Sequence, residues 1–217
     1  MLGNLIYKEF RLNVPVWLYL WLLFPVLVLI IPAWPFFIAF SWLFMVPLYI
    51  TQFDKMNQDL AFAVSLPVPK SGIVTARTCT VVLFELATLV VGIPCAIGHH
   101  LIWSVNNGAG MNPNMAFFGV VALMYALFNT IYLPGTYKTP YRMLWPLLGG
   151  TLAAVIVGGL LTTLFMAVPS WAHVLNDEGL GHLGAQLVVL LVGLVLYAGL
   201  TVVAWRRAVA TFEHTDL

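Results

Sequence analysis

One carboxylate lies where a charge is costly, inside a long apolar stretch of the chain. Glu85 follows Ala76, the first residue of that stretch, by nine positions, which is roughly 13 Å along a helix. An ionisable residue at such depth normally faces a cavity or a bonding partner. Two interpretations stay open. Glu85 lines a path for a cationic or amphipathic substrate, or its carboxyl bonds a hydroxyl such as that of Thr88 or of a tyrosine on a neighbouring helix.

Histidines and carboxylates occupy a second set of positions that could hold a metal ion or a haem group. Imidazole suits several transition metals, and histidines from two helices can ligate haem iron. No pair has a ligand spacing such as His-x-x-x-His, and polar aromatic side chains also suit a membrane interface. We therefore expect no metal site, and a haem- or metal-binding redox subunit is the alternative function. The residues concerned are His99, His100, His173, His182, Asp177 and Glu178.

Motifs for hydrolysis are missing from the chain. No lysine follows a glycine, as a Walker A loop requires, and none of the five serines lies in Gly-x-Ser-x-Gly. His-Glu-x-x-His and Cys-x-x-Cys are also absent. Cys79 and Cys95 are 16 positions apart in one apolar run, roughly 24 Å on a helix and beyond disulfide reach. We expect no enzyme activity here, so any ATP hydrolysis must come from a partner.

The composition explains why so few charges are available. The 217 residues are 62% hydrophobic and 8% charged, whereas ordinary soluble domains carry about 25% charged residues. The chain contains six apolar runs, each near the roughly 20 residues that a membrane helix needs. We expect an all-α membrane protein with six transmembrane helices in a single domain, 1–217. The predicted spans are 14–31, 33–53, 76–98, 115–133, 143–168 and 183–205, so the six-helix region covers 14–205 and a tail covers 206–217.

The nine basic residues predict how these spans are threaded. All of them precede the first run, follow the sixth, or lie in every second loop, and the alternate loops contain no lysine or arginine. Short cytoplasmic loops keep positive charge while translocated loops lose it. Both termini are therefore expected in the cytoplasm, with the basic surface facing lipid headgroups rather than nucleic acid. The residues are Lys8, Arg11, Lys55, Lys70, Arg77, Lys138, Arg142, Arg206 and Arg207.

Residues 1–13 are too short and too charged to cross a membrane. Their apolar residues follow helical spacing, while Asn4, Lys8 and Arg11 fall on the opposite side. This pattern predicts an amphipathic helix that lies on the cytoplasmic face of the membrane.

The stretch between the second and third runs predicts a short helix bounded by prolines. Residues 59–64 can be helical and must end before Pro67 and Pro69, because a residue that precedes proline resists the α conformation. Ser71 is then placed to cap the following helix. The mixture of polar and apolar residues suits a rigid contact surface, although a solvated connector fits the spacing equally well.

Small residues recur at every fourth position of the fifth run. Such a stripe lets two helices approach closely in a membrane. We expect close helix packing along it, against either the same chain or a second copy. The stripe consists of Gly150, Ala154, Gly158 and Thr162.

The order of these features resembles the ABC-2 type permease family. An acidic–basic pair, Asp54-Lys55, leaves the second run, and a short helix follows it. Ser-Leu-Pro-Val-Pro-Lys (65–70) and Ile-Val-Thr-Ala-Arg (73–77) then enter the third run. Family members have Leu/Met-Pro-Val/Ile-Ser/Thr-Arg at this place, so Pro69-Lys70 keeps the charge and removes a hydroxyl. Length, six spans, inside ends and the N-terminal helix extend the resemblance over the whole chain.

This resemblance implies the membrane subunit of a bacterial ABC exporter in the plasma membrane. Such a chain pairs with a second copy or a paralogue and docks two ATPase subunits, which bind ATP and Mg²⁺; no cofactor is expected in the chain itself. The coupling helices would be 57–66 and 137–142. The apolar walls and Glu85 suit an amphipathic or hydrophobic peptide, drug or lipid-like cargo. The implied ATPase-coupling contacts are Asn57, Asp59, Phe62, Leu66, Pro67, Lys70, Tyr137, Lys138, Tyr141 and Arg142.

Overall fold

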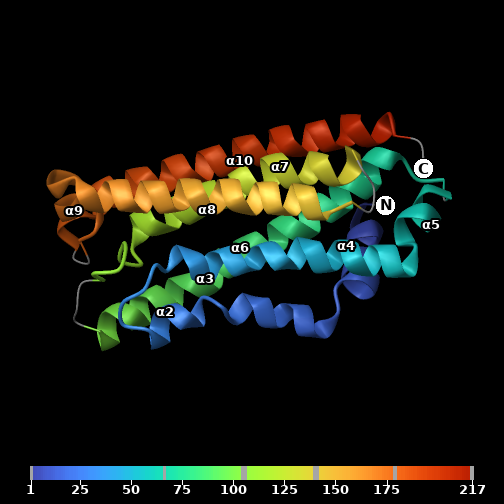
Figure 1. Ribbon diagram of the computed structural model, residues 1–217. Helices are drawn as coiled ribbons and strands as arrows, with labels where there is room; N and C mark the ends of the chain where they lie inside the picture. Colours follow the sequence, from blue (N-terminus) through green and yellow to red (C-terminus); the bar gives the residue numbers. More distant parts are fainter. Residues whose placement is uncertain (1, 66, 104–106, 139–141, 178–179, 216–217) are drawn as a thin grey trace.

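A computed structural model of the protein describes residues 2–65, 67–103, 107–138, 142–177 and 180–215. Within these ranges every regular element is helical and no strand occurs. The long helices run side by side in an elongated bundle (Figure 1). The prediction of an all-α membrane protein is confirmed.

Five helical stretches of the described chain are long and apolar enough to cross a membrane. Four of them are continuous and the fifth combines three short elements. The continuous ones are α6 (Lys70–Ile102), α7 (Met115–Lys138), α8 (Leu144–Ala167) and α10 (Leu183–Glu213). The combined one is Phe37–Asn57, made of α3 (Phe37–Ser41), η3 (Trp42–Phe44) and α4 (Met45–Asn57).

The predicted first span is broken rather than continuous. A 3₁₀ helix, η2 (Val16–Leu23), is followed by the short α2 (Val26–Ile30), because Pro25 lacks the N–H that would continue the ladder. Together η2 and α2 form the stretch Val16–Ile30, which is bent by 91° from the N-terminal helical segment Leu2–Asn13. If these two segments are counted as one bent span, the described chain has up to six spans. Pro15 causes the bend, since it keeps Val14 extended.

Helix α7 forms the centre of the bundle, and α8 and α10 flank it. Each of these two flanking helices has an exposed apolar face. Aromatic rings fill the space between α7 and the second span. The Phe128 ring stacks on Phe44 at 4.3 Å and on Tyr132 at 4.9 Å. Tyr125 packs edge-on against Phe44 at 5.9 Å and donates a hydrogen bond to the Phe40 carbonyl at 3.2 Å. The middle of the chain is therefore packed solid.

The small-residue stripe of α8 is its buried face and lies against α7 of the same chain. Gly150, Ala154, Gly158 and Thr162 are all buried. A Cβ added at Gly150 would lie 3.0 Å from the Phe128 ring, and one at Gly158 would collide with the Met124 side chain. The stripe is thus occupied within the chain.

Both chain ends lie at the same end of the bundle as the short helix α5 (Asp59–Ser65) (Figure 1). This helix is the one predicted at 59–64. The remaining short elements are α1 (Leu2–Lys8), the π-type turn η1 (Glu9–Asn13), α9 (Pro169–Leu175) and η4 (Leu180–His182).

One predicted boundary is wrong. Ser71 does not cap α6, because the helix already begins at Lys70 after the extended Pro69, whose carbonyl accepts from the Gly72 N–H at 2.9 Å. Most of the expected tail 206–217 is helical, since α10 continues to Glu213. Its last turns are held by the burial of Ala208 and Phe212.

Candidate functional site

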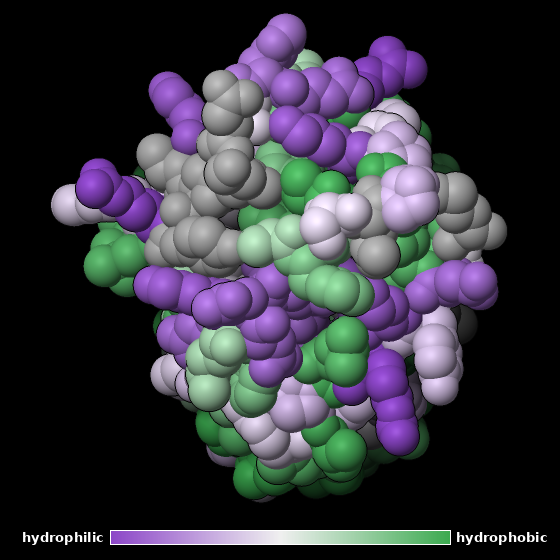
Figure 2. Space-filling view, turned by 90° about the vertical axis from the view of Figure 1, so that its right-hand side faces the viewer, coloured by the Kyte–Doolittle hydropathy of each residue, from purple (hydrophilic) through white to green (hydrophobic). Residues whose placement is uncertain are grey.

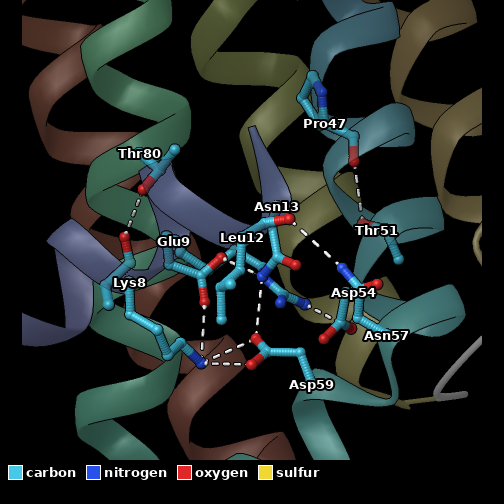
Figure 3. A network of polar contacts seen from close by, with 12 residues as sticks. Lys8, Glu9, Leu12, Asn13, Pro47, Thr51, Asp54, Asn57, Asp59 and Thr80 are labelled. Carbon is cyan, nitrogen blue, oxygen red and sulfur yellow. Dashed lines mark hydrogen bonds and ion pairs between the residues drawn. The ribbon is translucent and has the colours of Figure 1, made fainter. Parts of the chain in front are cut away.

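A buried cluster of charges joins the N-terminal segment to α5 (Figure 3). Lys8 Nζ donates to both carboxylate oxygens of Asp59, at 2.9 and 2.8 Å. Asn13 Nδ2 donates to Asp59 Oδ2 at 2.9 Å and to Glu9 Oε2 at 3.1 Å. Glu9, Asn13 and Asp59 are at most 3% exposed. The bonds of Lys8 and Asn13 to Asp59 join residues about fifty positions apart. Asn57 Nδ2 adds a 3.3 Å bond to the Leu12 carbonyl.

The same cluster reaches the start of α6 through Arg77. Arg77 Nη1 donates to Asp54 Oδ2 at 3.0 Å, and Arg77 Nε lies 3.6 Å from Glu9 Oε2. Arg77 Nη2 and Asp54 Oδ1 are buried and have no hydrogen-bond partner among the described residues. We call Lys8, Glu9, Asn13, Asp54, Asp59 and Arg77 the inner ion cluster. It ties together five elements, α1, η1, α4, α5 and α6.

Helix α5 is anchored on one side and exposed on the other. Asp59, Leu60 and Ala63 are buried against the bundle, whereas the Phe62 side chain is 60% exposed. The chain turns from α4 into α5 at Gln58, which takes the left-handed conformation with φ of 51°. That turn breaks the predicted helix 57–66 in two, so Asn57 belongs to the last turn of α4.

The structure separates the expected ATPase contacts into exposed and buried side chains. Two predicted contacts need correction: Asp59 lies inside the inner ion cluster, and Tyr137 is 2% exposed beneath Phe212, at 5.0 Å between rings. Neither side chain is available to a partner in this arrangement. Leu66 and Tyr141 lie outside the described residues. The exposed members are Asn57, Phe62, Pro67, Lys138 and Arg142.

Lys70 binds the C-terminal segment instead of pointing outward. Its Nζ donates to the Thr215 carbonyl at 2.9 Å and lies 5.4 Å from the centre of the Phe212 ring. Thr215 Oγ1 in turn donates to the Tyr137 carbonyl at 3.3 Å. The ends of α7 and α10 and the start of α6 are thereby clamped together.

Figure 2 looks at the end of the bundle that carries α5 and both termini. Hydrophilic side chains gather across this end, and apolar side chains are exposed between them. Met56 and Phe62 are apolar residues of α4 and α5 with 76% and 60% exposure. A surface of this kind, with apolar anchors inside a polar surround, is typical of protein–protein contacts.

Glu85 has hydrogen-bond partners on both neighbouring helices. Its Oε2 accepts from the Tyr197 hydroxyl of α10 at 2.7 Å and from Asn129 Nδ2 of α7 at 3.0 Å. Asn129 Nδ2 also lies 3.3 Å from Thr201 Oγ1. Thr88, by contrast, bonds its own helix at the Phe84 carbonyl. We call Glu85, Asn129, Tyr197 and Thr201 the central polar cluster.

No room for a substrate exists beside Glu85. The residue is 2% exposed, and the space that it shares with Phe44, Phe84 and Phe128 is too small for a water molecule. The geometry matches the hydrogen-bonding interpretation, with a tyrosine as one partner. Asn129 and Thr201 were missed by sequence reasoning, although an amide in the middle of an apolar run was a usable signal.

The outer histidines do not form a single group: His99 lies apart from His173 and His182. His99 is fully buried, with Nδ1 2.7 Å from the Val28 carbonyl, while the His173 and His182 rings pack edge-on at 5.0 Å. His182 Nδ1 lies 2.9 Å from Asp177 Oδ2. Glu178 is outside the described residues, and among the rest no three His, Cys, Asp or Glu side chains come close enough to hold a metal.

Asparagines that sequence reasoning missed tie the outer loops together. Asn107 Nδ2 donates to the Trp34 carbonyl at 2.7 Å, and Asn112 Nδ2 donates to the Asn176 carbonyl at 2.9 Å. Asn114 Nδ2 reaches the Leu175 carbonyl at 2.7 Å. These bonds close the outer end of the bundle.

No curated protein and no solved structure matches the chain. The profile of a family described as "ABC-2 family transporter protein" matches residues 4–213. The chain belongs to the ABC-2 transporter family and is a multi-pass membrane permease subunit of an ABC transporter.

Proposed function

We propose that this permease pairs with a second permease chain and two ATPase subunits to export an amphipathic or hydrophobic cargo across the bacterial plasma membrane. The second permease is another copy or a paralogue, and the ATPase subunits bind the ATP and Mg²⁺. The observation that carries this proposal is α5, a helix with an exposed Phe62 and an anchored opposite face.

The anchoring explains how force could pass from an ATPase into the membrane. A push on α5 moves Asp59, and Asp59 is bonded to Lys8 and Asn13 of the N-terminal segment. Glu9 in that segment faces Arg77 of α6. Charge-assisted bonds of this kind are roughly twice as strong as neutral ones, so a displaced α5 would take the N-terminal segment with it. The exposed Lys138 and Arg142 would form part of the second docking contact.

The packed interior supports pairing of two permeases. The aromatic core around Phe44 and Phe128 leaves no passage through the middle of one chain. Grooves lie on the outside, among them a space of about 570 Å³ between α3 and α8, with Ile38, Gly159 and Thr163 in its walls. A transport path in this family member would therefore form where two chains meet.

Charge supports the orientation. Termini and α5 share one end of the bundle, and all nine basic residues can lie on that side. On a background without native cysteines, Lys55→Cys and Gly108→Cys place single thiols on opposite ends, both exposed. We expect an impermeant maleimide to label Gly108→Cys, and not Lys55→Cys, in intact cells. The reverse pattern would invert the topology.

Replacement of Phe62 tests the docking surface directly. Phe62→Glu removes an apolar contact worth roughly 1.5–3 kcal/mol and adds the cost of burying a charge. We expect the variant to insert normally into the membrane. The ATPase subunit should no longer co-purify with it, and the ATP turnover of the complex should be lost. Phe62→Leu keeps an apolar contact, and His214→Glu adds a charge to an exposed site at the same end; both should retain the complex. If the Phe62→Glu variant still assembles fully with the ATPase subunit, α5 is a connector and not a docking contact.

A further inference from the structure

A groove runs between α6 and α10, close to the end that carries the termini. It holds about 420 Å³ of space, within the range of about 300–1,000 Å³ that is usual for small-ligand clefts. Cys79 and Val82 form the α6 wall, and Ala198, Val202 and Trp205 form the α10 wall. The groove opens to the outside of the bundle, where lipid would lie.

Most polar groups around this groove are bonded within the protein; Thr78 Oγ1 is the exception, since it is buried and has no hydrogen-bond partner among the described residues. Tyr197 donates inward to Glu85 at 2.7 Å, and Thr201 Oγ1 lies 3.3 Å from Asn129 Nδ2. At the inner limit, Trp205 Nε1 donates to Thr75 Oγ1 at 3.0 Å, which bridges α10 and α6. The surface that the groove presents is consequently apolar and complements a hydrocarbon chain.

Positive charge stands at the mouth of the groove. Arg206 follows Ala198 and Val202 at four-residue intervals, so it continues the row of residues that forms the α10 wall. Arg206 and Arg207 are exposed, and no described residue forms an ion pair with either. Glu213 is seven positions beyond Arg206, about 10 Å along the helix.

We infer that this groove binds one anionic phospholipid from the leaflet next to the termini. The acyl chain lies between α6 and α10, Trp205 sits at the level of the glycerol backbone, and the phosphate meets Arg206 and Arg207. Basic pockets between membrane helices bind acidic headgroups for the same reason, since guanidinium groups pair with phosphate. The lipid site is independent of the transport proposal because it needs neither cargo nor an ATPase.

Cys79 offers a direct probe of occupancy, because its thiol lines the groove while Cys95 is buried. In detergent, Cys95→Ser protein is titrated with phosphatidylglycerol or phosphatidylcholine, and the rate of Cys79 alkylation by N-ethylmaleimide is measured. We expect both lipids to slow alkylation at saturation. Phosphatidylglycerol should do so at a concentration lower by roughly fivefold for each arginine that contacts the phosphate.

Matched variants separate the headgroup from the chain. Arg206→Gln with Arg207→Gln should abolish the preference for phosphatidylglycerol, whereas lysine at both positions should keep it. Arg11→Gln, at an exposed arginine that does not line the groove, should leave this lipid preference unchanged. Ala198→Phe fills the groove and should protect Cys79 without any lipid.

Two results would overturn the lipid site. In the first, the protein that keeps both arginines needs the same concentration of each lipid for half-maximal protection of Cys79. The groove would then bind the hydrocarbon chain without recognising the headgroup. In the second, oxidation joins two chains through a Cys79–Cys79 disulfide, and protection of Cys79 increases with protein concentration. A second copy of the chain would then cover the groove.

Discussion

The inner ion cluster and the central polar cluster are both buried, yet they differ in what they connect. The inner ion cluster has charges of both signs and bridges five elements, from Lys8 in α1 to Arg77 in α6. In the central polar cluster, one acid, Glu85, is held by neutral groups of α7 and α10. Both make polar bonds in apolar surroundings, but only the inner ion cluster includes α5, the helix that carries the exposed Phe62.

The two clusters therefore have different roles: the inner ion cluster transmits movement between elements, and the central polar cluster stabilises helix packing. The inner ion cluster holds segments that are otherwise joined through turns, at Pro15 and at Gln58, so its bonds determine whether they move together. The helices around Glu85 are already fixed by aromatic packing and by the close approach of Gly119 in α7 to Gly193 in α10. Loss of the inner bonds should therefore lower stability strongly and also affect transport, whereas loss of the central bonds should lower stability only slightly.

The largest expected effect follows from removal of Arg77. Arg77→Met leaves Glu9 and Asp54 buried without their cation, and breaking a buried pair in this way costs about 3–5 kcal/mol. The free energy of unfolding, measured by denaturant titration in mixed micelles, should fall by that amount. Arg142→Gln removes an exposed arginine and should leave it unchanged. A loss under about 1 kcal/mol, the level of an exposed ion pair, would show that water reaches the cluster.

A double-mutant cycle on Lys8 and Asp59 should give the next largest effect. The pair is part-buried, with side-chain exposures of 19% and 3%, and contacting residues show coupling energies of about 0.5–3 kcal/mol. Lys8→Met should keep ATPase binding, because Phe62 stays exposed, but should lose cargo export. Asn4→Ala alters an exposed polar residue of α1 and serves as the control. Normal export by Lys8→Met would place force transmission elsewhere.

The smallest effect is expected at Glu85. Glu85→Leu removes bonds to Asn129 and Tyr197, and such bonds in membranes average about 0.6 kcal/mol. Glu85→Gln should lose less, since both partners bond the same oxygen, Oε2, and an amide oxygen can replace it. Neither change should lower transport of cationic cargo. Weaker transport by Glu85→Gln at unchanged stability would return Glu85 to the cargo path.

Local patterns predicted many elements correctly. The third to sixth apolar runs became the long continuous helices, the prolines after residue 65 ended α5, and the four-residue stripe of α8 became its packing face. These features depend on length, hydropathy and proline chemistry within one segment. The start of α6 could not be predicted as well, because Pro69 and Ser71 compete as start signals two positions apart.

The partners of the charged residues could not be read from local patterns. Lys8 was assigned to the solvent side of an amphipathic helix, yet it bonds Asp59. Tyr137 and Lys70 were placed on a docking surface, yet the C-terminal segment covers one and binds the other. In each case the deciding contact comes from residues dozens of positions away.

The sequence by itself determined that this protein is a helical membrane protein, because hydropathy and charge act on each segment separately as it meets the bilayer. The tertiary structure decided which polar groups face a partner and which are paired inside. A buried polar group must find a bond wherever the fold brings one within reach, and that depends on how helices pack rather than on their order along the chain.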